Sequence, residues 1–245
     1  MPKMRGSLDA REAIGASYPM NPKTADPFPA YDAEIRRLRR HLHSLDPAGW
    51  RRKSHCAGWS VKDVVAHLCT DELYNEACLD ETLGELAFPG SLNAWNEHGV
   101  RQRRHLTPAE VLAEWERRQK RVRRAWGRIG VRGKVPTSVG PYPLRLQVWH
   151  LAREYAIHAD DIELPVPARS KAARARWRID FGLFAAEEEG ETVSARVRDG
   201  VVELAQGRKR HELDPESFIA FLTDRPQQLR NPEQRRLVER LTRSR

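Results

Sequence analysis

Four segments of this sequence repeat apolar residues at the three- and four-residue spacing of an α-helix, and no other feature constrains the fold as strongly. Glycine and proline residues separate the segments, and two segments begin at capping boxes, Ser60 with Asp63 and Thr107 with Glu110. Four long helices joined by loops are typical of a four-helix bundle, in which sites form between facing helices. The segments cover about residues 30–45, 60–83, 107–129 and 144–161.

The pattern changes after residue 167. Residues 177–184 and 192–198 favour strands, and Asp199-Gly200 between two apolar runs predicts a hairpin. We therefore predict an α+β fold, with an N-terminal four-helix bundle and a small C-terminal α/β domain. The predicted boundaries are 1–27 for a flexible leader with little function, 28–166 for the bundle, 170–225 for the α+β domain, and 226–245 for a basic helix packed loosely on the surface.

Composition narrows the class of protein. Hydrophobic residues make up 40% and charged residues 31%, and no run approaches the roughly 18 apolar residues of a membrane span. We expect a cytoplasmic protein, because the polar N-terminus lacks the apolar centre of a secretory signal. We also expect a monomer or a homodimer. The three cysteines, Cys56, Cys69 and Cys78, form no C-x-x-C pair, so we expect free thiols.

The net charge of +9 raises the question of nucleic-acid binding. Arginines and a lysine cluster between Arg117 and Arg124, but Glu114 and Glu116 precede them at helical spacing and no nucleic-acid motif accompanies them. We interpret the stripe as a solvated helix face and do not expect a nucleic-acid partner. The alternative is a metal-containing bundle, without enzymatic activity, that binds an anionic ligand or nucleic acid.

A row of ionisable side chains lies along the segment of residues 149–161. At 3.6 residues per turn, His150, Glu154 and His158 form a slanted row on one helix face, and Asp161 follows as a same-face neighbour. His67 on the second segment is able to join this row inside a bundle, although a lone histidine is more often structural. Cys78 lies about 16 Å along the helix from His67, too far for both to bind one metal ion.

The string Gly58-Trp59-Ser60-Val61-Lys62-Asp63-Val64-Val65-Ala66-His67-Leu68, with Glu154-x-x-x-His158-x-x-Asp161, resembles the mycothiol-dependent maleylpyruvate isomerase family. The resemblance covers about residues 28–225, in the family's order and spacing. It implies a DinB-like four-helix metal-binding bundle followed by a smaller C-terminal domain.

The resemblance also implies roles for individual residues. His67, Glu154 and His158 match the family's ligands of a divalent metal, commonly zinc, and Asp161 matches an aspartate that assists near the metal. Arg225 matches a C-terminal arginine that usually follows glycine in an L-x-G-R context, but here Asp224 precedes it, which puts a carboxylate-binding role in doubt. We place His150 in the outer shell, where it orients a ligand.

These residues predict a catalytic metal site. Two imidazoles and one carboxylate leave an open fourth position on a divalent metal, and a thiol entering that position ionises at neutral pH. The resemblance implies a metal-dependent, mycothiol-using S-transferase or isomerase that acts on a small electrophile. We expect the thiol to come from outside the protein, as mycothiol.

Overall fold

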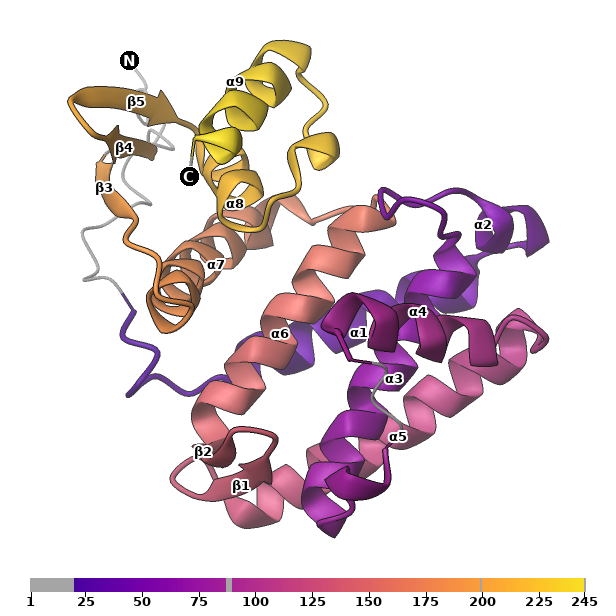
Figure 1. The fold of residues 1–245 in the computed structure, drawn as a ribbon. Coiled ribbons are helices and arrows are strands. Elements are labelled where there is room, and N and C mark those ends of the chain that lie inside the picture. The colour runs from indigo at the N-terminus through magenta and orange to yellow at the C-terminus, as the bar shows by residue number, and fades with distance from the viewer. Residues whose placement is uncertain (1–19, 87–89, 199, 245) are drawn as a thin grey trace, which may run out of the picture.

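The computed structural model describes residues 20–86, 90–198 and 200–244 and confirms the α+β fold. Four long helices form the N-terminal bundle, with α6 crossing the centre of the molecule in Figure 1. Short elements complete this half: α2, α4 and a two-stranded hairpin that leads into α6. The bounds are α1 Phe28–Ser44, α2 Pro47–Arg51, α3 Val61–Asp80, α4 Leu92–Gln102, α5 Pro108–Ile129, β1 Lys134–Thr137, β2 Gly140–Pro143 and α6 Leu144–Asp161.

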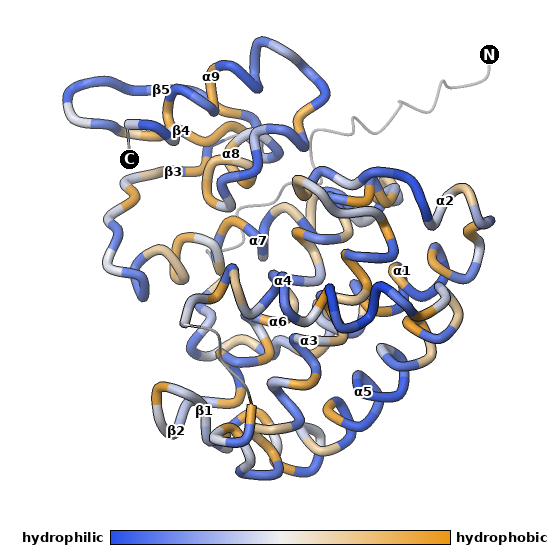
Figure 2. The backbone as a smooth tube through the Cα atoms, turned by 45° about the vertical axis from the view of Figure 1, so that its right-hand side comes forward, coloured by the Kyte–Doolittle hydropathy of each residue, from blue (hydrophilic) through white to orange (hydrophobic). Residues whose placement is uncertain are grey.

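Both predicted capping boxes are present. The Ser60 hydroxyl accepts from the backbone N–H of Asp63, whose carboxylate accepts from the backbone N–H of Ser60, and Thr107 and Glu110 repeat the arrangement at the start of α5. Hydrophilic and hydrophobic residues alternate along α5 in Figure 2, as an amphipathic helix requires. The helix starts were therefore predictable from local sequence.

The bundle core is built around large aromatic side chains. Tyr31, Trp126 and Tyr155 are buried, and the Tyr31 ring lies 5.7 Å from that of Trp126 and 5.6 Å from that of Tyr155. Glu72 of α3 is fully buried among them and accepts hydrogen bonds from the hydroxyls of Tyr31 and Tyr155. Burial raises the pKa of Glu72 to about 8, although the two tyrosine hydroxyls oppose the shift.

Helix α4 packs closely on α3. A Cβ atom at Gly99 would lie 2.1 Å from the Thr70 Oγ1 and 2.7 Å from its Cγ2, so a glycine is needed at this approach. Arg103 fixes the contact, because its Nη1 donates to the Gly99 carbonyl at 2.9 Å and to the Thr70 hydroxyl at 3.2 Å. Glu114 of α5 accepts from the same guanidinium, so three helices meet at one buried arginine.

The predicted strand at residues 177–184 is wrong, because these residues lie inside the helix α7, Ala168–Glu188. This helix packs against two cores. Phe181 stacks on Trp149 of α6 at 5.9 Å between ring centroids, whereas Ile179 packs with the C-terminal elements. Apolar residues on two faces remove the single helical stripe, and a short run of them imitates a buried strand.

The C-terminal part is a three-stranded antiparallel sheet with two helices, at the top of Figure 1. The predicted hairpin is present between β3 and β4, although Asp199 of its turn lies outside the described residues. Helix α9 is not loosely packed, because Val238 and Leu241 are buried in one core with Phe218 of α8. The elements are β3 Ser194–Arg198, β4 Val201–Gln206, β5 Lys209–Leu213, α8 Pro215–Leu222, the 3-10 turn η2 Pro226–Gln228 and α9 Pro232–Arg243.

The end of the predicted leader contacts α7, since the backbone N–H of Met20 donates to the Asp180 carboxylate at 2.8 Å. Residues 1–19 of that leader lie outside the described residues. Within the described ranges, no helix is both long enough and apolar enough to span a bilayer. The predicted boundaries at 28–166, 170–225 and 226–245 stay predictions.

Candidate metal centre

Three predicted ligands come together between α3 and α6. His67, Glu154 and His158 each offer one donor atom, and these atoms lie within 4.8 Å of one another. The two imidazole rings meet edge to face at 4.6 Å between centroids, and Glu154 Oε2 lies 3.5 Å from His158 Nε2. The two facing helices therefore bring together the group that the sequence suggested.

The two histidines are buried, with 3% and 4% of their surfaces exposed, whereas the Glu154 side chain is 38% exposed. The indole of Trp59 lies 5.4 Å from the His67 ring, and its Nε1 donates to Glu97 of α4. The donor group thus has an aromatic wall on one side, and it is partly open at Glu154.

The charges of the group suit a cation. Burial and the neighbouring His158 lower the pKa of His67 to about 3, so its imidazole is neutral and has a lone pair available. Burial opposes ionisation of Glu154, but the hydrogen bond and charge of His158 outweigh it and lower the Glu154 pKa to about 2. The His158 pKa is raised despite burial, because Asp161, Cys56 and Glu154 all contact the ring.

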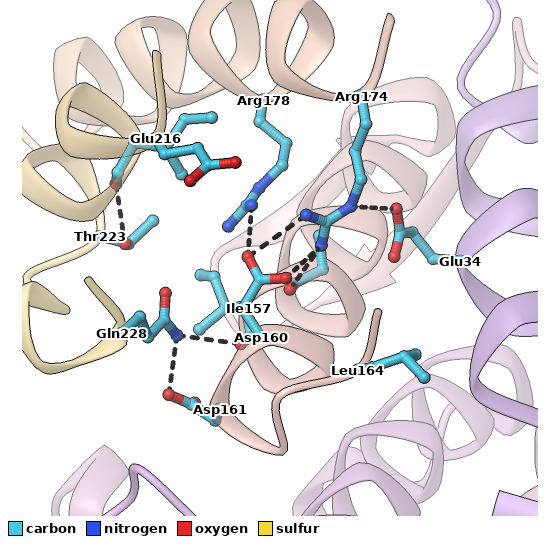
Figure 3. A network of polar contacts seen from close by, with 12 residues as sticks. Glu34, Ile157, Asp160, Asp161, Leu164, Arg174, Arg178, Glu216, Thr223 and Gln228 are labelled. Carbon is cyan, nitrogen blue, oxygen red and sulfur yellow. Dashed lines mark hydrogen bonds and ion pairs between the residues drawn. The ribbon is translucent and has the colours of Figure 1, made fainter. Parts of the chain in front are cut away.

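Asp161 holds the other edge of His158. Its Oδ2 lies 3.0 Å from His158 Nδ1, and its Oδ1 accepts from Gln228 Nε2 at 2.7 Å, as Figure 3 shows for Gln228. The carboxylate is fully buried, yet these hydrogen bonds keep its pKa at about 2. Asp161 fixes the ring orientation of His158, and Gln228 from the C-terminal domain fixes Asp161 in turn.

Arg225 also reaches this edge. Its Nε lies 3.8 Å from Asp161 Oδ2, and one Nη donates to the carbonyl of Asp224. Asp224 has a φ of 49°, in the left-handed region that glycine would favour and that aspartate tolerates better than most residues. The departure from glycine at this position therefore keeps a glycine-like backbone, and the guanidinium still points toward the site.

Sequence reasoning missed Cys56. This residue lies in the loop before α3, and its Sγ donates to Asp161 Oδ2 at 3.1 Å and lies 3.8 Å from His158 Nδ1. Cys56, His158 and Asp161 form a second group with donor atoms within 4.8 Å. No sequence signal identified Cys56, because a loop residue carries no helical register.

Asp71 was also missed as a site residue. Its Oδ2 lies 3.4 Å from His67 Nε2 and is a buried oxygen without a hydrogen bond in the described structure. Burial, followed by the charge of Glu154, raises the Asp71 pKa. Its position one turn after His67 was the available signal, since side chains four apart share a helix face.

His150 lies elsewhere, contrary to the predicted outer-shell role. Its Nε2 lies 2.9 Å from Glu188 Oε2 of α7 and 3.2 Å from the Tyr142 hydroxyl, and its ring packs edge to face on Phe181. These contacts turn it toward α7, because a helical row drifts around the axis over two turns.

A buried ion network lies beside the centre. Asp160 forms ion pairs with Arg174 and Arg178 of α7, and Arg174 also donates a hydrogen bond to Glu34 of α1 at 2.8 Å (Figure 3). Adjacent carboxylates at the end of α6 thus face different partners, Asp160 toward α7 and Asp161 toward the candidate centre. The network fixes the end of α6 that carries His158.

Three arginines of the basic stripe on α5 form ion pairs with carboxylates of the same chain. Arg118 contacts Glu76 and Glu114, Arg121 contacts Asp80 at 2.7 Å, and Arg123 contacts Asp32 at 2.8 Å. These arginines join α5 to α3 and α1. The pairing supports a structural role for the stripe.

Comparison with known proteins agrees with this geometry. A family model described as the mycothiol maleylpyruvate isomerase N-terminal domain matches residues 31–163, more than half of the chain. The chain belongs to this enzyme family. The matched segment contains all three residues of the donor group and Asp161, while Arg225 and Gln228 lie beyond it.

Two solved structures share the fold of this family member. One, a mycothiol-dependent maleylpyruvate isomerase, is 17% identical, covers 81% of this chain and 88% of its own, and has a TM-score of 0.57. The other, a histidine-to-alanine mutant of a mycothiol-dependent maleylpyruvate isomerase, is 18% identical over 68% of this chain and 72% of its own, with a TM-score of 0.53. No curated protein sequence matches the chain.

Proposed function

We propose that this protein is a cytoplasmic, metal-dependent enzyme that uses mycothiol either to form a thiol adduct with a small electrophile, as an S-transferase, or to isomerise that electrophile. The convergence of His67, Glu154 and His158 in one family-matched bundle carries the proposal. Two imidazole nitrogens and a carboxylate suit zinc and several other divalent metals, with zinc preferred. The free cysteines suit a reducing compartment.

The residues present fit a metal ion. The Nδ1 of His67 is a buried nitrogen without a hydrogen bond among the described residues, so a metal ion would give this atom a partner. The second donor group fits less well, because both Asp161 oxygens are already engaged by Gln228, His158 and Cys56. We therefore assign the ligands as His67, Glu154 and His158.

The bound metal would supply the charge that keeps a thiol ionised at neutral pH. Asp161 orients the His158 ring through Nδ1, and its carboxylate is our candidate for the base that accepts the thiol proton. Arg225 provides a positive charge next to Asp161 for a carboxylate of the substrate. The substrate isomerises if the thiol adds to a double bond and departs again after rotation about that bond. If the thiol instead displaces a leaving group, it remains bonded to the product through its sulfur.

Metal content and product mass test the proposal. Protein purified without chelator should contain close to one equivalent of metal, and His67→Ala should lose it. Incubation with mycothiol and electrophiles that include maleylpyruvate should then give either thiol adducts or an isomer of unchanged mass. Wild-type protein with less than a tenth of an equivalent, unchanged in His67→Ala, contradicts the metal site.

Transferase activity is the slightly favoured branch of this proposal, because the family covers more proteins than the isomerase reaction explains. The two branches differ in one observable. A thiol adduct that accumulates with time identifies transfer, and a substrate with altered geometry and regenerated thiol identifies isomerisation.

A further inference from the structure

A cavity of about 320 Å³ lies at the junction of α3, the β1–β2 hairpin, α6 and α7. It is separate from the donor group, although it lies along the same pair of helices. The lining side chains that carry a hydrogen-bonding group are Tyr74, Thr137, Tyr142, Gln147, His150 and Glu188. Its volume is at the lower end of the range for small-ligand sites.

The polar groups of the cavity are held in place by one another and by the neighbouring Asn75 and Ser138. Glu188 accepts from the Tyr142 hydroxyl at 2.6 Å and contacts His150 Nε2 at 2.9 Å. Gln147 donates to Asn75 at 2.8 Å, and the Tyr74 hydroxyl contacts the Ser138 hydroxyl at 3.1 Å. A set of fixed hydroxyl, amide, imidazole and carboxylate groups is prepared to exchange hydrogen bonds with a ligand.

This lining selects a ligand chemistry. Two tyrosine rings offer flat apolar surfaces, and the surrounding groups both donate and accept hydrogen bonds, which matches a ring with hydroxyl groups around its edge. The Glu188 carboxylate disfavours an anion, and the six polar side chains of the lining would lose hydrogen bonds to water without replacement if a hydrocarbon filled the cavity.

The cavity lies one helical turn from Glu154 on α6 and two turns from His67 on α3. On α6, His150 precedes the donor Glu154 by four residues, about 6 Å along the axis. On α3, Tyr74 follows Asp71 by three residues, and Asp71 contacts His67. A ligand ring in the cavity thus lies about 6 Å from Glu154 on α6 and about 10 Å from His67 on α3, measured along the helix axes.

We propose that this cavity binds a hydroxylated six-membered ring of the thiol cosubstrate, while its cysteine sulfur extends along α3 and α6 to the metal centre. The inference rests on the proposed function, because mycothiol joins a cysteine to a pair of hydroxylated rings, glucosamine and inositol. His150 then has a role in binding the thiol instead of orienting a metal ligand.

A binding experiment with the thiol-free ring compound, glucosaminyl inositol, tests the site independently of catalysis. Calorimetry on the full chain should show binding with and without metal, and Tyr142→Phe and His150→Gln should weaken it at least tenfold. His43→Gln is the matched control, because His43 forms a similar histidine–glutamate pair with Glu116, at 2.8 Å on α1 and α5. Its affinity should equal that of the wild type.

Kinetics separate this inference from the proposed function. With mycothiol, Tyr142→Phe should raise KM at least tenfold at unchanged kcat, whereas with N-acetylcysteine, which lacks the rings, the variant and wild type should behave alike. If the protein binds the ring compound but contains no metal and shows no turnover, the ring binding supports the cavity assignment, and the lack of metal and turnover contradicts the proposed function. Absence of ring binding, equal affinity in Tyr142→Phe and His150→Gln, or equally strong binding of a simple alkyl amine would each overturn the cavity assignment.

Discussion

Replacement of Glu72 by glutamine should stabilise the protein at neutral pH and remove a large part of its pH dependence. Glu72 is fully buried, and its pKa is raised from 4.5 to about 8. In the unfolded chain the carboxyl ionises near its ordinary pKa, so unfolding between these two values releases a proton. The free energy of unfolding therefore falls as pH rises from about 4.5 to about 8, and is independent of this group outside that window.

The magnitude follows from the shift. At about 1.4 kcal/mol per pKa unit, the full window corresponds to about 5 kcal/mol, and the part already lost at pH 7 to about 3 kcal/mol. Glutamine keeps hydrogen-bonding groups for Tyr31 and Tyr155 without a charge to bury. For a chain of this length, Glu72→Gln should raise the Tm at pH 7 by roughly 5 to 10 °C.

Thermal and urea unfolding followed by circular dichroism at pH 5, 6, 7 and 8 measures this effect, with chelator present so that metal binding does not contribute. Glu216→Gln is the control, because the Glu216 side chain is 75% exposed. The gap between Glu72→Gln and wild type should widen with pH while the control stays flat. A constant gap from pH 5 to pH 8 would refute the reasoning.

Three further changes address the site and the packing. Asp161→Asn should keep metal content near wild type and lower turnover at least tenfold, because an uncharged amide cannot take the thiol proton; unchanged turnover in the same assay would make Asp161 structural. Arg225→Gln should raise KM for a carboxylate substrate more than for an uncharged electrophile, and an equal effect on both would contradict anion binding. Gly99→Ala should cost about 1–3 kcal/mol in urea unfolding because of Thr70, whereas Gly84→Ala, with open space around its Cβ, should cost much less.

The bundle could be predicted because its signals are local. Ser60 and Thr107 mark helix starts through side chains three residues away, and apolar residues at helical spacing in the four long segments pack into one main core. Helix α7 lacked that advantage. It packs against two cores, so its apolar residues occupy two faces of the helix. The resulting short apolar run at residues 177–184 led to the prediction of a strand.

The donor residues could be predicted where they share a helix face, and they could not be predicted where they approach from a loop or a turn. Helical spacing places Glu154 and His158 on one face, and the family resemblance adds His67 from a facing helix. Cys56 and Gln228 approach through tertiary contacts of a loop and a turn, which leave no periodic trace. His150 shows the limit of the helical row, since a slanted row turns away from a site within two turns.

The segment matched by the family model ends at residue 163, but the charges at the end of α6 are balanced by residues beyond it. Asp160 depends on Arg174 and Arg178, and Asp161 depends on Gln228. The segment matched by the family model is therefore shorter than the set of residues that holds the end of α6. An excised bundle would leave a buried carboxylate without its arginines, and a chimera with a foreign C-terminal domain would have to reproduce three side chains before it reproduced the orientation of His158.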